Sequence, residues 1–228
     1  MQSTRRFRAL PYAALISVVV ALGMAFFYAP TEAIQGHVQR VFYIHVPTAW
    51  ISYLAFVIVA LASILVLRGR DTDRWDRIAG ASGEVGFVFA SVFIVTGMIW
   101  AKRAWGIAWA WDTRMTSALV LWLIYGGYVL FRSQSAPGER RARLAAVIGI
   151  IGAIDIPIVH FAVTWWNSAH PPATVLRPGG PDLPGSMLLT LLVSLVAFTV
   201  VFAAMLVARM SLDAERTAAT EARDVARV

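Results

Sequence analysis

Cysteine is absent from this chain of 228 residues, and charged residues make up only 14% of it. Without cysteine there is no disulfide, no thiol redox pair and no C-x-x-C-H site for covalent haem attachment. The sequence also lacks a Walker A phosphate loop and the residue spacings of serine hydrolases and metalloproteases. These absences exclude a c-type cytochrome, a thiol oxidoreductase and an ATPase, and we expect the chain to be no enzyme.

Long apolar runs take the place of the missing charge, since 59% of the residues are hydrophobic. Six runs have about the 20 residues that a membrane span needs: 10–29, 47–67, 82–100, 113–131, 144–163 and 185–208. In lipid such runs must be helices, because every backbone N–H and C=O has to be paired internally. We therefore predict an all-α integral membrane protein with six transmembrane helices in residues 1–211 and a short charged tail in residues 212–228.

The first run permits two interpretations. Arg5, Arg6 and Arg8 precede it, and small residues follow near position 23, as in a cleaved signal peptide. The apolar run nevertheless continues through the aromatic residues 26–28, which is typical of an anchor that stays in the membrane. We favour the anchor.

Arginine and lysine are distributed unevenly between alternate connecting segments. Fifteen of the 20 fall in the N-terminus, the tail and the connections after the second and fourth runs. Because cytoplasmic segments are enriched in Lys and Arg, we predict that both termini are cytoplasmic and that the loops at about 30–46, 101–112 and 164–184 face outward. The same bias explains the net charge of +7 without a nucleic-acid partner.

Tryptophan is concentrated on the predicted outer side. Residues 105–116, WGIAWAWDTRMT, contain three tryptophans, an aspartate and an arginine. Plain membrane anchoring explains any single tryptophan, but an ordinary aromatic belt decorates both interfaces. Here seven of the nine tryptophans lie at or beyond the outer ends of runs: Trp50, Trp100, Trp105, Trp109, Trp111, Trp165 and Trp166. Because an indole offers a large flat π-face and one N–H donor, this surface suits a large, flat, amphipathic ligand such as a porphyrin.

All four histidines also fall on the outer side or in the outer half of a span. His45 lies just before Pro47, which can occupy the first turn of a helix. His170 precedes two prolines, which favour an extended backbone. Two imidazoles from different outer loops can approach a haem iron from opposite sides. Spacing alone does not select His45 and His170, since a lone histidine is more often structural.

Three segments together resemble a known family. They are VFYIHVPTAW (41–50), TGMIWAKRAWGIAWAWDTRMTSALVLWLIY (96–125) and IDIPIVHFAVTWWNSAH (154–170). The tryptophan-rich element is similar to the signature of the haem-handling proteins of cytochrome c biogenesis. The six runs and the flanking residues resemble the CcmC family within that group.

The resemblance implies a function and a set of site residues. It implies a six-helix bundle in the bacterial inner membrane, with a haem platform on its outer, periplasmic face. It implies that His45 and His170 are the axial ligands of the haem iron. The platform residues that it implies are Trp105, Gly106, Trp109, Trp111 and Asp112. The implied cargo is haem b, which the family passes to the periplasmic haem chaperone CcmE, working with the ABC transporter subunits CcmA and CcmB and the small membrane protein CcmD.

Physical roles can be assigned to the motif. If Trp105 and Trp109 lie on a short helix, both rings share one face, and Trp111 points elsewhere. Gly106 would permit close approach of a porphyrin or backbone. Asp112 either caps the next helix or fixes a ligand histidine.

Each of the basic residues near the motif has two alternative roles. Arg114, Lys102 and Arg103 either pair with haem propionates or extend to the interface. Asp155 lies well within the fifth run, where an ionisable group is usually functional, and no direct pair with His160 is expected. Glu84 is expected to reach the headgroup region.

Three alternatives stay open. Met115 and Asp155 stand where related chains often have leucine and asparagine, so a CcsA-like cytochrome c synthase component is a possible subtype. An integral b-type electron-transfer cytochrome would bury its haem between helices, whereas the candidate ligands here fall in predicted loops. A transporter that carries haem through its own six spans would need a polar path, for which only Asp155 and Glu84 are available.

Overall fold

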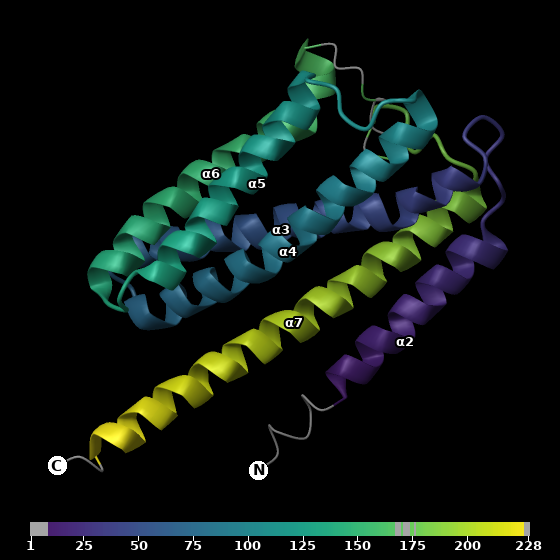
Figure 1. The fold of residues 1–228 in the computed structure, drawn as a ribbon. Helices are drawn as coiled ribbons and strands as arrows, with labels where there is room; N and C mark the ends of the chain where they lie inside the picture. Colours follow the sequence, from purple (N-terminus) through teal and green to yellow (C-terminus); the bar gives the residue numbers. More distant parts are fainter. Residues whose placement is uncertain (1–8, 167–169, 171–173, 176, 226–228) are drawn as a thin grey trace.

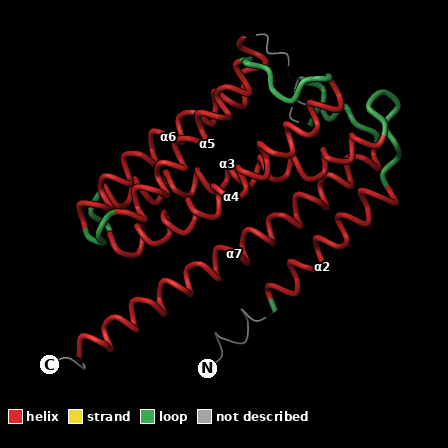
Figure 2. The backbone as a smooth tube through the Cα atoms, in the orientation of Figure 1, coloured by secondary structure: helices red, strands yellow, loops and turns green. Residues whose placement is uncertain are grey.

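The computed structural model describes residues 9–166, 170, 174–175 and 177–225. Arg5, Arg6 and Arg8, like the two prolines after His170, lie outside the described residues. Within the described part all regular structure is helical, apart from one isolated bridge between Glu32 and Gly36. Figure 2 shows the helices joined by short loops at two ends. The prediction of an all-α fold is therefore confirmed.

Six helical segments are long and apolar enough to cross a membrane, as predicted. The first consists of α2 (Leu10–Gly23) and the π-helical turn η1 (Met24–Tyr28). The second begins with the short helix η2 (His37–Val41) and continues as α3 (Phe42–Leu67). The others are α4 (Thr72–Trp105), α5 (Thr113–Gln134), α6 (Glu139–Trp166) and α7 (Gly185–Val225). Most helices extend beyond the apolar runs, because polar residues at their ends continue the backbone hydrogen bonding.

The start of α3 differs from the sequence-based expectation. Pro47 lies inside the helix, five residues after its first residue, Phe42, rather than in its first turn. A proline at this position loses the hydrogen bond to the carbonyl four residues earlier and crowds that carbonyl, but the apolar residues before it gain burial, since Phe42 and Tyr43 are buried. The predicted loop at 30–46 is therefore too long, and His45 belongs to a helix.

Helix α3 is central, because it contacts α4, α6 and α7. Helix α5 packs against α4 and α6, while α2 runs beside α7 (Figure 1). The loops at 29–36 and 106–112 and the described part of 174–184 gather at one end of the bundle, which we call the tryptophan end. Helix α2 begins and α7 ends at the opposite end (Figure 1).

Glycine and aromatic residues fill the contact between α3, α5 and α6. The rings of Phe56 and Tyr125 stack with their centroids 3.5 Å apart. The Tyr125 hydroxyl donates a hydrogen bond to the carbonyl oxygen of Gly149 at 3.0 Å. Small residues let helix backbones approach closely in membranes, and a Cβ at Gly152 would lie 2.8 Å from the Tyr125 ring.

Ion pairs join the helices toward the end opposite the tryptophans. Asp76 of α4 accepts hydrogen bonds from Arg132 of α5 and Arg141 of α6. Glu84 pairs with Arg209 of α7, whose Nη2 lies 2.9 Å from the Glu84 Oε1, and its reach to the headgroup region stays a prediction. These pairs hold α4, α5, α6 and α7 together at the end opposite the tryptophans.

Candidate functional site

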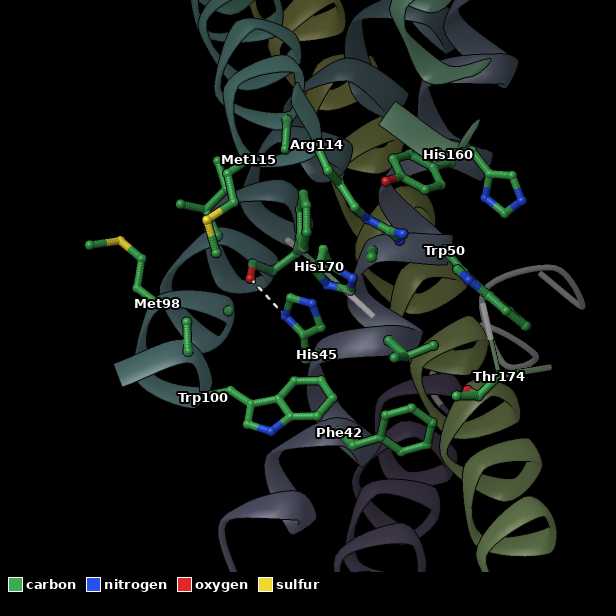
Figure 3. A pocket seen from close by; sticks show the side chains of 18 of the residues that line it. Phe42, His45, Trp50, Met98, Trp100, Arg114, Met115, His160, His170 and Thr174 are labelled. Atoms are coloured by element: carbon green, nitrogen blue, oxygen red, sulfur yellow. Dashed lines mark hydrogen bonds between the residues drawn. The ribbon is translucent and has the colours of Figure 1, made fainter. Parts of the chain in front are cut away.

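A pocket opens at the tryptophan end between α3, α4, α5 and α6. The space in and around it that no protein atom fills, open solvent at the mouth included, is about 1190 Å³. Figure 3 shows side chains from these helices converging on it. Its lining includes Phe42, His45, Trp50, Tyr53, Phe93, Gly97, Met98, Trp100, Trp105, Trp109, Arg114, Met115, His160, His170 and Thr174. The lining is therefore mostly apolar and aromatic, with a few polar groups, as in ligand pockets generally.

The His45 side chain is held by α4. Only 8% of this residue is exposed, and its Nδ1 lies 3.0 Å from the carbonyl oxygen of Phe93. A carbonyl only accepts hydrogen bonds, so Nδ1 carries the hydrogen and Nε2 keeps a free lone pair. Gly97 leaves room for the ring, because a Cβ there would lie 2.8 Å from His45 Cε1. The imidazole is thus oriented with one nitrogen suited to binding a metal.

His170 reaches the same pocket from the segment between α6 and α7. Its ring lies edge-on to Trp105, with the centroids 5.9 Å apart. It also lies within electrostatic range of His45, and both rings line the pocket (Figure 3). The structure therefore brings together two imidazoles that are 125 residues apart in the sequence.

The tryptophan-rich segment is not a short helix, so the condition under which Trp105 and Trp109 would share one helix face is not met. Helix α4 ends at Trp105, and Gly106 follows with a φ of +80°. This left-handed conformation favours glycine and commonly ends a helix. Lys102 Nζ donates a hydrogen bond to the Gly106 carbonyl at 2.9 Å. A Cβ at Gly106 would meet no protein atom within 4 Å, so close approach of a protein backbone does not explain this glycine.

Trp105 and Trp109 nevertheless line one pocket, and the chain bends at Gly106 between them. Trp109 has a buried indole N–H without a partner among the described residues. Trp111 points elsewhere, as expected: it is 78% exposed and lies outside this pocket. Its ring makes an edge contact with Trp109 at 5.8 Å.

Asp112 caps α5, which was one of its two predicted roles. Its Oδ1 accepts a hydrogen bond from the Met115 backbone N–H at 2.8 Å. The cap fixes the first turn of α5, and this turn carries Arg114. Arg114 points into the pocket (Figure 3), whereas Lys102 and Arg103 do not line it.

Several lining residues were not selected from the sequence. Trp50 and Trp100 belong to the outer tryptophans, which is the one signal that pointed to them. Trp100 makes an edge contact with His45 at 5.6 Å. Tyr53 and Phe93 lie within apolar runs, where no sequence pattern distinguishes a pocket residue from a packing residue.

Asp155 lies outside the pocket. It is 8% exposed, and its Oδ2 has no hydrogen-bond partner among the described residues. It borders a second, more open space beside Trp111, Asp112 and Thr116. No hydrogen bond joins it to His160 within the described part of the chain, in agreement with the helical spacing.

Comparison with known proteins gives a consistent assignment. A family model described as Heme exporter protein C matches residues 2–224. A Heme exporter protein C of Bradyrhizobium diazoefficiens is 39% identical over 206 residues, which cover 89% of this chain and 78% of that protein. The Escherichia coli K12 protein of the same name is 33% identical over 171 residues, covering 74% and 69%. A ccmC-like mitochondrial protein of Marchantia polymorpha is 34% identical over 179 residues, covering 78% and 75%. The chain therefore belongs to the haem exporter protein C family.

Proposed function

We propose that this haem-handling membrane protein of cytochrome c biogenesis binds haem b as cargo in the pocket at the tryptophan end. One observation carries the proposal: two histidines from distant segments meet in an aromatic pocket (Figure 3). Haem needs a flat apolar site and axial ligands for its iron. The pocket residues fit both needs.

His45 and His170 would be the axial ligands. The hydrogen bond from His45 Nδ1 to the Phe93 carbonyl supports ligation through Nε2. His170 lies in a segment between helices, beside the Trp105 ring. Because His170 is not part of a spanning helix, its detachment from the iron would not require a helix to shift, which suits a cargo that must be released.

The tryptophan-rich segment would form the wall against which the porphyrin stacks. Trp105 and Trp109 line the pocket, and Gly106 makes the turn between them. Trp111 would extend this wall at the rim, where it is exposed. Asp112 would support the wall by capping α5.

The site would lie on the outer, periplasmic face of the bacterial inner membrane. The excess of arginine in the loops at the opposite end supports this orientation. From this position the chain would deliver haem to the periplasmic chaperone CcmE. We propose that it works with CcmA, CcmB and CcmD.

A second candidate is an integral b-type electron-transfer cytochrome. The burial of His45 inside α3 favours it, because b-type cytochromes hold haem between helices. The position of His170 outside the helices favours haem transfer to another protein instead.

A CcsA-like cytochrome c synthase component would use the same site. Incubating the haem-loaded protein with haem-free CcmE separates these functions, since only a transfer protein gives its haem to CcmE.

The first experiment is the visible spectrum of the purified protein with and without each histidine. We expect a low-spin haem spectrum in the parent, because two imidazoles would bind the iron. His45→Ala and His170→Ala should each give a high-spin or much weaker spectrum. His37→Ala is the matched control, since His37 is exposed and lies outside the pocket. A parent protein that stays colourless after haem addition would contradict the proposal.

A further inference from the structure

The charge of the pocket is of one sign only. None of its described lining residues is an aspartate or a glutamate, whereas it contains one arginine, and its three histidines are counted as neutral. The Trp109 indole N–H is a further donor there without a partner. A pocket of hydrogen-bond donors without acidic groups favours an anionic ligand.

Arg114 is the main source of this charge. Its half-buried side chain makes no hydrogen bond or ion pair with any described residue. Asp112 acts on it electrostatically, but Asp112 also serves as the cap of α5. A partly desolvated cation without a close ion pair is costly, so a bound anion would stabilise the Arg114 guanidinium.

Each of the other described cations at the tryptophan end has a hydrogen-bond or ion-pair partner or is exposed to solvent. Arg40 donates to the Phe26 carbonyl, and Lys102 donates to the Gly106 carbonyl. Arg177 pairs with an aspartate five residues away. Arg103 is exposed to solvent. Among the described cations of this end, only Arg114 is both partly buried and unpaired.

Two further polar side chains accompany Arg114 inside the pocket. Tyr53 and His160 both line it, and the charge of Arg114 acts on each of them. Figure 3 shows the Arg114 guanidinium reaching into the pocket toward the side where His160 lies. The apolar lining from Phe42 and Trp100 lies elsewhere in the pocket. Tyr53 and His160 are, besides His45, the polar lining residues on which the charge of Arg114 acts, and we define the arginine recess as Arg114, His160 and Tyr53.

We propose that the arginine recess binds one propionate carboxylate of the porphyrin, so that this edge of the cargo enters the pocket instead of facing solvent. The inference rests on the proposed function, because it takes the porphyrin as cargo. A guanidinium matches the two oxygens of a carboxylate, and the phenol and imidazole can each donate a further hydrogen bond. Recognition then depends on the carboxylate as well as on the iron.

The test compares metal-free protoporphyrin with its dimethyl ester, using fluorescence titration of the detergent-purified full chain. Neither probe contains iron, so the result does not depend on axial ligation. We expect the parent to bind the free acid about 10- to 100-fold more tightly than the ester, as charged hydrogen bonds allow. Arg114→Gln should remove most of this preference, and His160→Gln should reduce it. Arg103→Gln and His37→Gln, both at exposed positions, should leave it unchanged.

The outcomes separate this inference from the proposed function. Equal affinities for acid and ester in the parent would overturn the arginine recess, even if haem still gives a histidine-dependent spectrum. An unchanged preference in Arg114→Gln would overturn it as well. A clear preference that Arg114→Gln removes, together with a haem spectrum that ignores His45 and His170, would support the recess and refute the ligand assignment.

Discussion

At the scale of single residues, the site depends on how each side chain is held. His45 is oriented by a backbone carbonyl of α4 and by the space that Gly97 leaves. Asp112 acts on the site indirectly, because its cap fixes the turn that carries Arg114. Because each of these side chains is positioned by only one or two neighbours, a substitution at such a neighbour should change haem binding specifically.

Gly97→Ala tests how the His45 ring is held. The added methyl group would lie 2.8 Å from His45 Cε1, so the ring must move and weaken its bond to the Phe93 carbonyl. Such overpacking typically costs about 1–3 kcal/mol. We therefore expect haem affinity to fall about 5- to 100-fold in a haem titration.

Gly127→Ala is the matched control for this substitution. It adds the same methyl group within α5, where a Cβ would meet no atom within 4 Å. It should preserve haem affinity and gain slightly in helix stability. If Gly97→Ala binds haem as tightly as the parent does, with the same spectrum, then Gly97 does not position His45.

At the scale of elements, buried ion pairs connect the helices at the end opposite the site. Asp76 lies on α4 and pairs with Arg132 of α5 and Arg141 of α6. The side chains of Asp76 and Arg132 are each only 10% exposed. Since the Asp76 carboxylate is shared by Arg132 and Arg141, it fixes where three helices meet, and the opposite ends of the same helices frame the pocket.

Asp76→Asn should therefore destabilise the bundle strongly. It leaves two arginine side chains without their counter-charge, which costs about 3–5 kcal/mol when a buried pair is broken. For a chain of this size we expect the melting temperature to fall by roughly 6–20 °C. Circular dichroism of the detergent-purified protein measures this change.

Glu139→Gln provides the comparison. It breaks an ion pair in which Arg143 and Glu139 are 54% and 66% exposed. Exposed pairs contribute little, about 0–1 kcal/mol, so the melting temperature should hardly change. Equal shifts in the two variants would mean that the Asp76 pairs do not hold the helices together.

At the scale of the whole molecule, the orientation in the membrane is the main prediction. The absence of cysteine makes it simple to test, because a single introduced cysteine is the only thiol. Ile34 is 92% exposed in a loop of the tryptophan end, and Ala136 is exposed in the loop between α5 and α6. A membrane-impermeant maleimide should label Ile34→Cys in intact spheroplasts and Ala136→Cys only after lysis. The cysteine-free parent controls for background, and the reverse labelling pattern would place the pocket on the cytoplasmic face.

Much of the fold could be predicted from the sequence. The six spans follow from apolar length alone, because lipid leaves an isolated segment no option except a helix. The cap at Asp112 is equally local, since it needs only residues three apart. The start of α3 could not be predicted in this way, because burial of Phe42 and Tyr43 against other helices offsets the cost of Pro47.

The sequence by itself determined the class of protein, the number of spans and the tryptophan-rich segment, because these depend on composition and on short-range pattern. Only the tertiary structure decided how His45 is held, that His170 lines the same pocket and which polar residues join Arg114. These relations join residues on different helices, and neither apolar periodicity nor spacing along the chain specifies which faces meet. The packing of α3 against its neighbours does, through contacts between side chains far apart in the sequence.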